Sequence, residues 1–109
     1  MKDDRVYLAH IADAIGQILS YTIGGRDEFM KNRMIQDAVV RNLEVTGEAT
    51  KRLSDATKAQ CPEVPWRRVA GLRDSLIHDY MGVNLEEVWR VIESRLPDLR
   101  DAVERLLNE

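Results

Sequence analysis

The chain has 109 residues, of which 44% are hydrophobic and 32% charged, and its net charge is −3. This length predicts a single domain, residues 1–109, with the composition of an ordinary globular protein. The negative charge argues against non-specific nucleic-acid binding over the whole surface. The aromatic content of 6% argues against an all-β fold, and no apolar run approaches the roughly 20 residues that cross a bilayer.

The first helix is predicted between Asp3 or Asp4 and about Tyr21. Its apolar residues recur at spacings of three and four, as on one face of a helix. The paired glycines Gly24 and Gly25 follow, and such a pair is typical of a helix end and the loop after it.

A second, longer helix is predicted from Asp27, as its N-cap, to about Ala56, because apolar residues keep the helical period throughout. Gly47 falls inside this run. A glycine in a helix interior costs up to about 1 kcal/mol, which indicates close approach of another backbone. Residues 59–65, with two prolines, are expected to form a loop.

Three further helices are predicted in the C-terminal half. Pro65 suits the first position of the third helix, which extends to about residue 81 before Gly82. Asn84 and Glu87 resemble a capping box that begins a fourth helix, and Pro97 interrupts the pattern before a last helix. The prediction is an all-α fold: an antiparallel bundle of four to five helices that dimerises.

Arg73 is placed in the middle of the apolar stripe of the third helix. On a regular helical wheel, six residues of the stripe lie within about 60° of it: Trp66, Val69, Ala70, Leu76, Ile77 and Tyr80. An unpaired buried guanidinium would cost several kcal/mol. Arg73 therefore needs an anionic partner, or the stripe opens into a cleft or an interface there.

His78 lies five residues further on, about 140° round the same wheel. A regular helix therefore does not bring Arg73 and His78 of one chain to the same phosphate. Either the helix distorts near Ile77, or the arginine and histidine of two chains combine across a two-fold interface. A histidine near a helix C-terminus favours its charged form, and it titrates near neutral pH, so it can serve as an acid or a base.

A pair of this kind can cleave RNA without a metal. A base removes the 2′-hydroxyl proton, an acid protonates the leaving 5′-oxygen, and a guanidinium stabilises the phosphoryl oxygens. The sequence has no cluster at metal-ligand spacing and no Gly-rich phosphate loop, so we expect no cofactor and no metal. On spacing alone, a structural interpretation stays open, with Tyr80 packed and His78 on the surface. His10 is expected to be a solvated helix residue.

Two other features bear on partners and compartment. From residue 51 to residue 73 the sequence has six basic and two acidic residues, a local balance of +4. This run is compatible with a basic surface beside the third helix, although a solvated helix face is the commoner meaning of such a run. The single cysteine, Cys61, cannot form an internal disulfide, and the N-terminus lacks a signal-peptide pattern. We therefore expect a cytoplasmic protein with no membrane partner, in which Cys61 is an ordinary thiol.

The segment from Arg73 to Tyr80, Arg-Asp-Ser-Leu-Ile-His-Asp-Tyr, resembles the HEPN superfamily, and within it the HepT-like toxins of toxin–antitoxin pairs. The resemblance covers nearly the whole chain. It includes the opening amphipathic helix and further segments at residues 43–50, 66–74, 76–84, 88–92 and 96–97.

The resemblance implies a dimeric helical bundle that is a metal-independent endoribonuclease, with RNA as substrate. Arg73 and His78 would be the catalytic pair at the dimer cleft, with Asp74 and Ser75 as supporting residues. The family often has Asn where this chain has Asp74. Tyr80 matches the tyrosine that an MNT-type nucleotidyltransferase antitoxin modifies with AMP, a bulky anion that would compete for the phosphate site.

Two functional interpretations follow from these residues, with a purely structural helical subunit as a third. The first is the ribonuclease toxin, and it is favoured by His78, because a phosphate anchor alone needs no acid–base group. The second is a non-catalytic subunit that binds nucleotide or RNA for a nucleotidyltransferase, with Arg73 as the anchor. The negative net charge favours this second interpretation.

Overall fold

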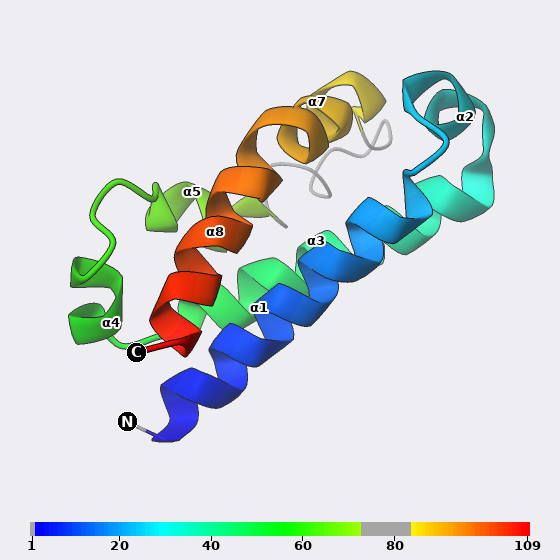
Figure 1. The fold of residues 1–109 in the computed structure, drawn as a ribbon. Helices are drawn as coiled ribbons and strands as arrows, with labels where there is room; N and C mark the ends of the chain where they lie inside the picture. Colours follow the sequence, from blue (N-terminus) through cyan, green and yellow to red (C-terminus); the bar gives the residue numbers. More distant parts are fainter. Residues whose placement is uncertain (1, 73–83) are drawn as a thin grey trace.

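The computed structural model describes residues 2–72 and 84–109, with side chains from residue 4. All regular elements in these two ranges are helical, which confirms the all-α prediction (Figure 1). The elements are α1 (Lys2–Tyr21), α2 (Arg26–Lys31), α3 (Arg33–Lys51), α4 (Asp55–Ala59), α5 (Trp66–Ala70), α7 (Leu85–Arg90), the π-helical segment η1 (Val91–Arg95) and α8 (Leu96–Leu107).

The long helices α1 and α3 run antiparallel and form the centre of the bundle (Figure 1). α8 packs against α1, and α5 packs against α3. The contact between α1 and α3 buries five large apolar side chains completely: Ile11, Ile15 and Ile18 from α1 and Val39 and Leu43 from α3. Burial of each contributes about 1.5–3 kcal/mol, so the contact between α1 and α3 supplies much of the stability.

The predicted end of the first helix is confirmed. α1 ends at Tyr21, and Gly25 adopts a φ of 90° in the turn that follows. This left-handed conformation strains residues that carry a Cβ. Among the described residues, no helix is long and apolar enough to cross a membrane.

The prediction of one helix from Asp27 to about Ala56 is wrong, because Asn32 divides it. Asn32 has an extended backbone (φ −110°, ψ 104°), and its side chain accepts a hydrogen bond from the Ile35 amide at 3.2 Å. It therefore ends α2 and caps α3, a position that asparagine prefers to a helix interior. Asp27 lies in the first turn of α2, whose N-cap is Gly25.

Ser54 divides the same predicted helix a second time. It caps α4, and its hydroxyl accepts from the Thr57 amide at 3.2 Å. The buried carboxylate of Asp4, in the first turn of α1, accepts from the Ser54 amide at 3.0 Å and from the Ser54 hydroxyl at 2.6 Å. It also accepts from the Thr57 hydroxyl. The Ser54 hydroxyl, followed by that of Thr57, holds the pKa of Asp4 below its ordinary value.

The C-terminal half keeps its helical conformation through Pro97 instead of breaking there. The predicted N-cap is confirmed, since the Asn84 side chain accepts from the Glu87 amide at 3.1 Å. Pro97 cannot donate to the preceding turn, and its ring would clash with the carbonyl four residues back. The π-helical turn of η1, in which the Leu96 amide donates to the Val91 carbonyl, lies directly before it. A widened turn of this kind relieves the conflict without ending the helix.

The predicted third helix, from Pro65 to residue 81, is also interrupted. Pro65 stands at the N-cap instead of the first helical position, and α5 ends at Ala70. Gly71 follows with φ −89° and ψ 4°, outside the helical region. Gly71 therefore ends α5, and the part of the predicted third helix from residue 73 to residue 81 lies outside the described residues.

We predict that Asp4 stabilises the protein in a pH-dependent way. Asp4→Asn removes a charge-assisted hydrogen-bond acceptor and should lower the free energy of unfolding at pH 7 by about 2 kcal/mol. Because the folded-state pKa is depressed, the stabilisation is complete above the ordinary value of 3.8 and is lost as the pH falls through the folded-state pKa. Urea unfolding between pH 7 and pH 2 measures both effects.

The control is Asp13→Asn, the same change at an exposed position of α1. It should leave the unfolding free energy within about 0.5 kcal/mol of the wild type. Equal unfolding curves for the two variants would contradict the role of Asp4.

Candidate functional site

The five residues predicted for the site all lie outside the described residues. Arg73, Asp74, Ser75, His78 and Tyr80 belong to the range 73–83, for which the structure provides no geometry. The two ends of this range are defined by Leu72, which is buried, and by Asn84, which caps α7. The described elements on either side of this range are α5, which precedes it, and α7, which follows it.

The element that leads into the range is anchored through Trp66. Its indole Nε1 donates to the carbonyls of Lys58 in α4 and Cys61 in the following loop, each at 3.0 Å, which ties α5 to both. Cys61 is buried, and this burial raises the pKa of its thiol. The thiol is therefore protonated at neutral pH and a poor nucleophile, which agrees with the expectation of an ordinary thiol.

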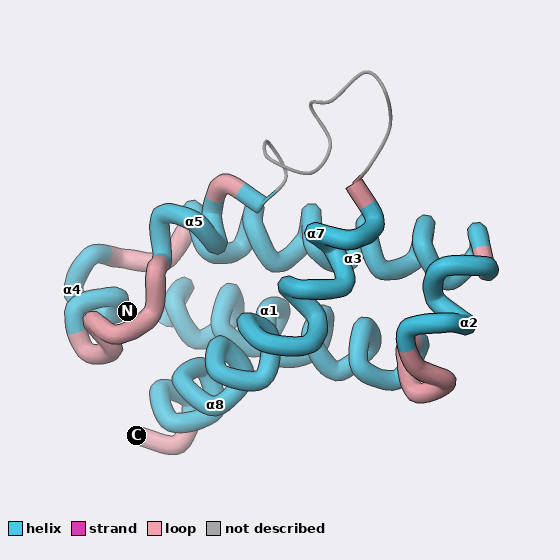
Figure 2. Tube along the Cα trace, turned by 90° about the horizontal axis from the view of Figure 1, so that it is seen from above, coloured by secondary structure: helices cyan, strands magenta, loops and turns pink. Residues whose placement is uncertain are grey.

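The helix that follows the range, α7, is anchored by contacts with α2. Trp89 of α7 packs against Phe29 of α2, with ring centroids 5.5 Å apart. Arg26 also forms an ion pair with Glu86. α5 ends and α7 begins on the same side of the bundle (Figure 2). Both ends of the predicted catalytic segment are thus held on one face.

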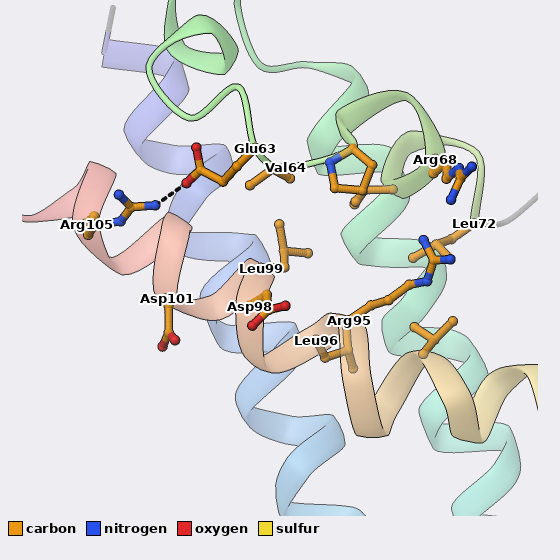
Figure 3. Close-up of a pocket in the computed structure, with 13 residues that line it drawn as sticks. Glu63, Val64, Arg68, Leu72, Arg95, Leu96, Asp98, Leu99, Asp101 and Arg105 are labelled. Atoms are coloured by element: carbon orange, nitrogen blue, oxygen red, sulfur yellow. Dashed lines mark hydrogen bonds and ion pairs between the residues drawn. The ribbon is translucent and has the colours of Figure 1, made fainter.

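A pocket of about 480 Å³ lies between the α5 region and the helix formed by η1 and α8 (Figure 3). Its apolar lining comes from both walls: Val64, Pro65, Val69 and Leu72 on one, and Val91, Leu96 and Leu99 on the other. Charged side chains complete the lining: Glu63, Arg68, Arg95, Asp98, Asp101 and Arg105. Leu72, the residue before Arg73 in the sequence, contributes to this pocket.

The ends of the pocket differ in charge. At one end, Glu63 forms an ion pair with Arg105 (Figure 3). The backbone amide of Glu63, followed by the Arg105 guanidinium, holds the pKa of Glu63 below its ordinary value. Towards Leu72, the pocket is lined by Arg68 and Arg95 (Figure 3). Both of these arginines are exposed, so the pocket offers positive charge towards Leu72.

The basic run predicted from residue 51 to residue 73 is divided between two places. Arg68 lines the pocket beside Leu72, whereas Arg52 lines a second pocket of about 380 Å³ with His10 and Arg41. His10 is exposed, as predicted. Its ring packs edge-on against that of Tyr7, with the ring centroids 6.1 Å apart. Within residues 2–72 and 84–109, no three His, Cys, Asp or Glu side chains are grouped so as to hold a metal ion.

The sequence prediction missed Arg95 and Asp98. These residues stand on either side of Leu96 and Pro97, where the apolar period predicts only a helix start. The available signal was their spacing of three, which places two opposite charges on one helix face. They line one pocket with Arg68 because α5 packs on α3 and α8 packs on α1, and a local sequence pattern does not predict this tertiary packing.

Comparison with known proteins covers nearly the whole chain. A family profile described as Ribonuclease HepT-like matches residues 11–106. A Thermococcus cleftensis protein named "Probable ribonuclease HepT" is 39% identical over 106 residues, 96% of each chain. A Methanocaldococcus jannaschii protein named "Putative RNase MJ0127" is 38% identical over 109 residues, 99% of this chain and 90% of the relative.

A third relative, "Putative RNase TTE0752" of Caldanaerobacter subterraneus, is 36% identical over 110 residues, 100% of this chain and 98% of its own. No solved structure matches the chain significantly. The profile spans the great majority of the sequence, and these relatives are aligned over almost their entire length. The chain therefore belongs to the HepT-like ribonuclease family.

Proposed function

We propose that this protein is a metal-independent endoribonuclease and the toxin of a HEPN/MNT toxin–antitoxin pair. The observation that carries the proposal is the family match over residues 11–106, which contains the whole Arg-x4-His segment. The name of the Thermococcus relative supports RNA as the substrate. In this proposal residues 1–109 form one cytoplasmic domain.

In the proposed reaction, His78 of one subunit removes the proton of a ribose 2′-hydroxyl. The 2′-oxygen attacks the phosphorus, the bond from phosphorus to the 5′-oxygen breaks, and a protonated histidine returns a proton to that oxygen. The products are a 2′,3′-cyclic phosphate and a 5′-hydroxyl. Arg73 stabilises the charge on the phosphoryl oxygens during this step, and Asp74 and Ser75 support the pair.

We propose that two chains combine to form the site, and that a nucleotidyltransferase antitoxin neutralises it. The reaction uses an acid and a base, and a two-fold dimer supplies two copies of His78 and Arg73. Transfer of AMP from ATP to the Tyr80 hydroxyl releases pyrophosphate and adds a bulky anion seven residues after Arg73, which would compete with the RNA phosphate. The anchoring of α5 and α7 on one face supports a site that a second chain can approach.

The first prediction of this proposal concerns catalysis. His78→Ala and Arg73→Ala should each lower the rate of RNA cleavage by about 10²–10⁴-fold, because each removes a group that acts in the transition state. EDTA should leave the wild-type rate unchanged. Cleavage of a labelled RNA, with analysis of the product ends, measures the effect.

The matched control is His10→Ala, which removes the other histidine, an exposed residue of α1, and should cleave at the wild-type rate. Wild-type cleavage by His78→Ala would exclude this residue as the acid or base. A wild type that binds RNA through Arg73 without cleaving it would favour the non-catalytic binding subunit.

The second prediction concerns the dimer. Sedimentation equilibrium at micromolar concentration should give about 25 kDa, twice the 12.5 kDa of one chain. Mixing Arg73→Ala subunits with His78→Ala subunits should restore part of the activity if the two residues act from different chains. A species of 12.5 kDa alone would contradict the shared site.

The third prediction concerns Tyr80. Co-expression with the cognate nucleotidyltransferase should add AMP to the wild type but not to Tyr80→Phe, and Tyr80→Phe should remain active in its presence. Intact mass and peptide mapping locate the group. Tyr21→Phe, which alters a tyrosine that is 36% exposed, is the control and should still be modified. AMP on another residue would remove Tyr80 from the mechanism.

A further inference from the structure

The arginines that line the pocket beside Leu72 differ in their partners. Arg105 forms an ion pair with Glu63. By contrast, neither Arg68 nor Arg95 forms an ion pair with any residue in the described ranges 4–72 and 84–109. Two guanidinium groups that line one pocket and form no ion pair can both donate hydrogen bonds to a bound anion. This end of the pocket is therefore prepared for a negatively charged group.

The apolar lining of the pocket indicates a ligand that has an apolar part as well as a negative charge. Apolar side chains of the two walls, Val64 and Val69 on one and Leu99 on the other, together form an apolar floor for the pocket. The volume of about 480 Å³ is within the range of about 300–1,000 Å³ that is typical of small-molecule sites. An inorganic anion alone would gain nothing from such a floor.

Asp98 adds a third requirement. It lies between the Glu63–Arg105 pair and Arg95 (Figure 3), is exposed, and forms no ion pair within the described residues. Its carboxylate can only accept hydrogen bonds, and it repels a second phosphate. The pocket thus combines a phosphate-binding end, an apolar floor and an acceptor, which is the pattern of one nucleotide with a donor on its base or ribose.

We propose that this pocket is the subsite for one RNA nucleotide next to the cleaved phosphate. Arg68 and Arg95 bind the phosphate of that nucleotide, and its base lies on the apolar floor. Asp98 accepts a hydrogen bond from an exocyclic amino group, which adenine, cytosine and guanine have and uracil lacks. The inference rests on the proposed function, since Leu72 places the pocket at the residue before Arg73 in the chain.

The test uses full-length protein that carries His78→Ala, so that RNA is bound without being cleaved. Fluorescence anisotropy with short single-stranded oligo(A), oligo(C) and oligo(U) gives Kd as a function of salt. Adding Arg68→Ala or Arg95→Ala should raise Kd for oligo(A) about tenfold. Replacing both arginines should lower the salt slope by about 0.7, the value for one lost phosphate contact on a single strand.

The control is Arg67→Ala, the same change in charge at an exposed neighbour on α5 that does not line the pocket. It should leave Kd and the salt slope as they are in the parent protein. Asp98→Ala should remove a roughly tenfold preference for oligo(A) and oligo(C) over oligo(U). In the background with His78 intact, Arg68→Ala should raise KM with little change in kcat.

The outcomes separate this inference from the proposed function. A wild type that cleaves no RNA would contradict the proposed ribonuclease function. Binding of oligo(A) that depends on Arg68 and Arg95 would still support the nucleotide pocket in that case. A wild type that cleaves RNA, with Arg68→Ala and Arg95→Ala indistinguishable from Arg67→Ala, overturns the pocket. Loss of the dimer on Arg68→Ala would also overturn it, because the pocket would then hold a second chain.

Discussion

The antiparallel contact between α1 and α3 positions the elements that line the pocket. α8 packs on α1 and α5 packs on α3, so the two walls of the pocket are carried by the two members of one helix pair. The buried hydroxyls of Thr46 and Thr50 donate to carbonyls of their own helix, at 2.9 and 2.8 Å. α3 therefore satisfies its own buried polar groups. Any change that separates α1 from α3 alters the pocket without touching its lining.

Sequence pattern was reliable where one local signal decides the structure. The apolar period and the paired glycines located α1, and the Asn84 cap located the start of α7. The long second helix was wrong because its apolar period continues across Asn32 and Ser54, where short side chains cap new helices. Pro97 misled in the other direction, since η1 absorbs the proline within a continuous helix.

In the candidate site, too, the part that one local sequence signal marks was predictable and the part that depends on tertiary packing was not. The Arg-x4-His segment stands out in the sequence, and a family resemblance gives its residues their roles. The pocket next to it was not predictable, because its walls are about 30 residues apart in the chain and meet only through tertiary packing. Gly71 shows the limit most clearly: the apolar period continues across it, but α5 ends at Ala70 and Gly71 lies outside helical geometry.

Because the single cysteine, Cys61, is buried, its reaction with a thiol reagent can report local unfolding of the loop before α5. A thiol reagent can reach Cys61 only when the loop before α5 separates from the core, which also breaks the bond from the Trp66 indole to the Cys61 carbonyl. The alkylation rate, compared with that of a free thiol, then gives the free energy of this opening. Because that loop supports one wall of the pocket, a ligand that bridges both walls would slow the labelling of a residue it never contacts.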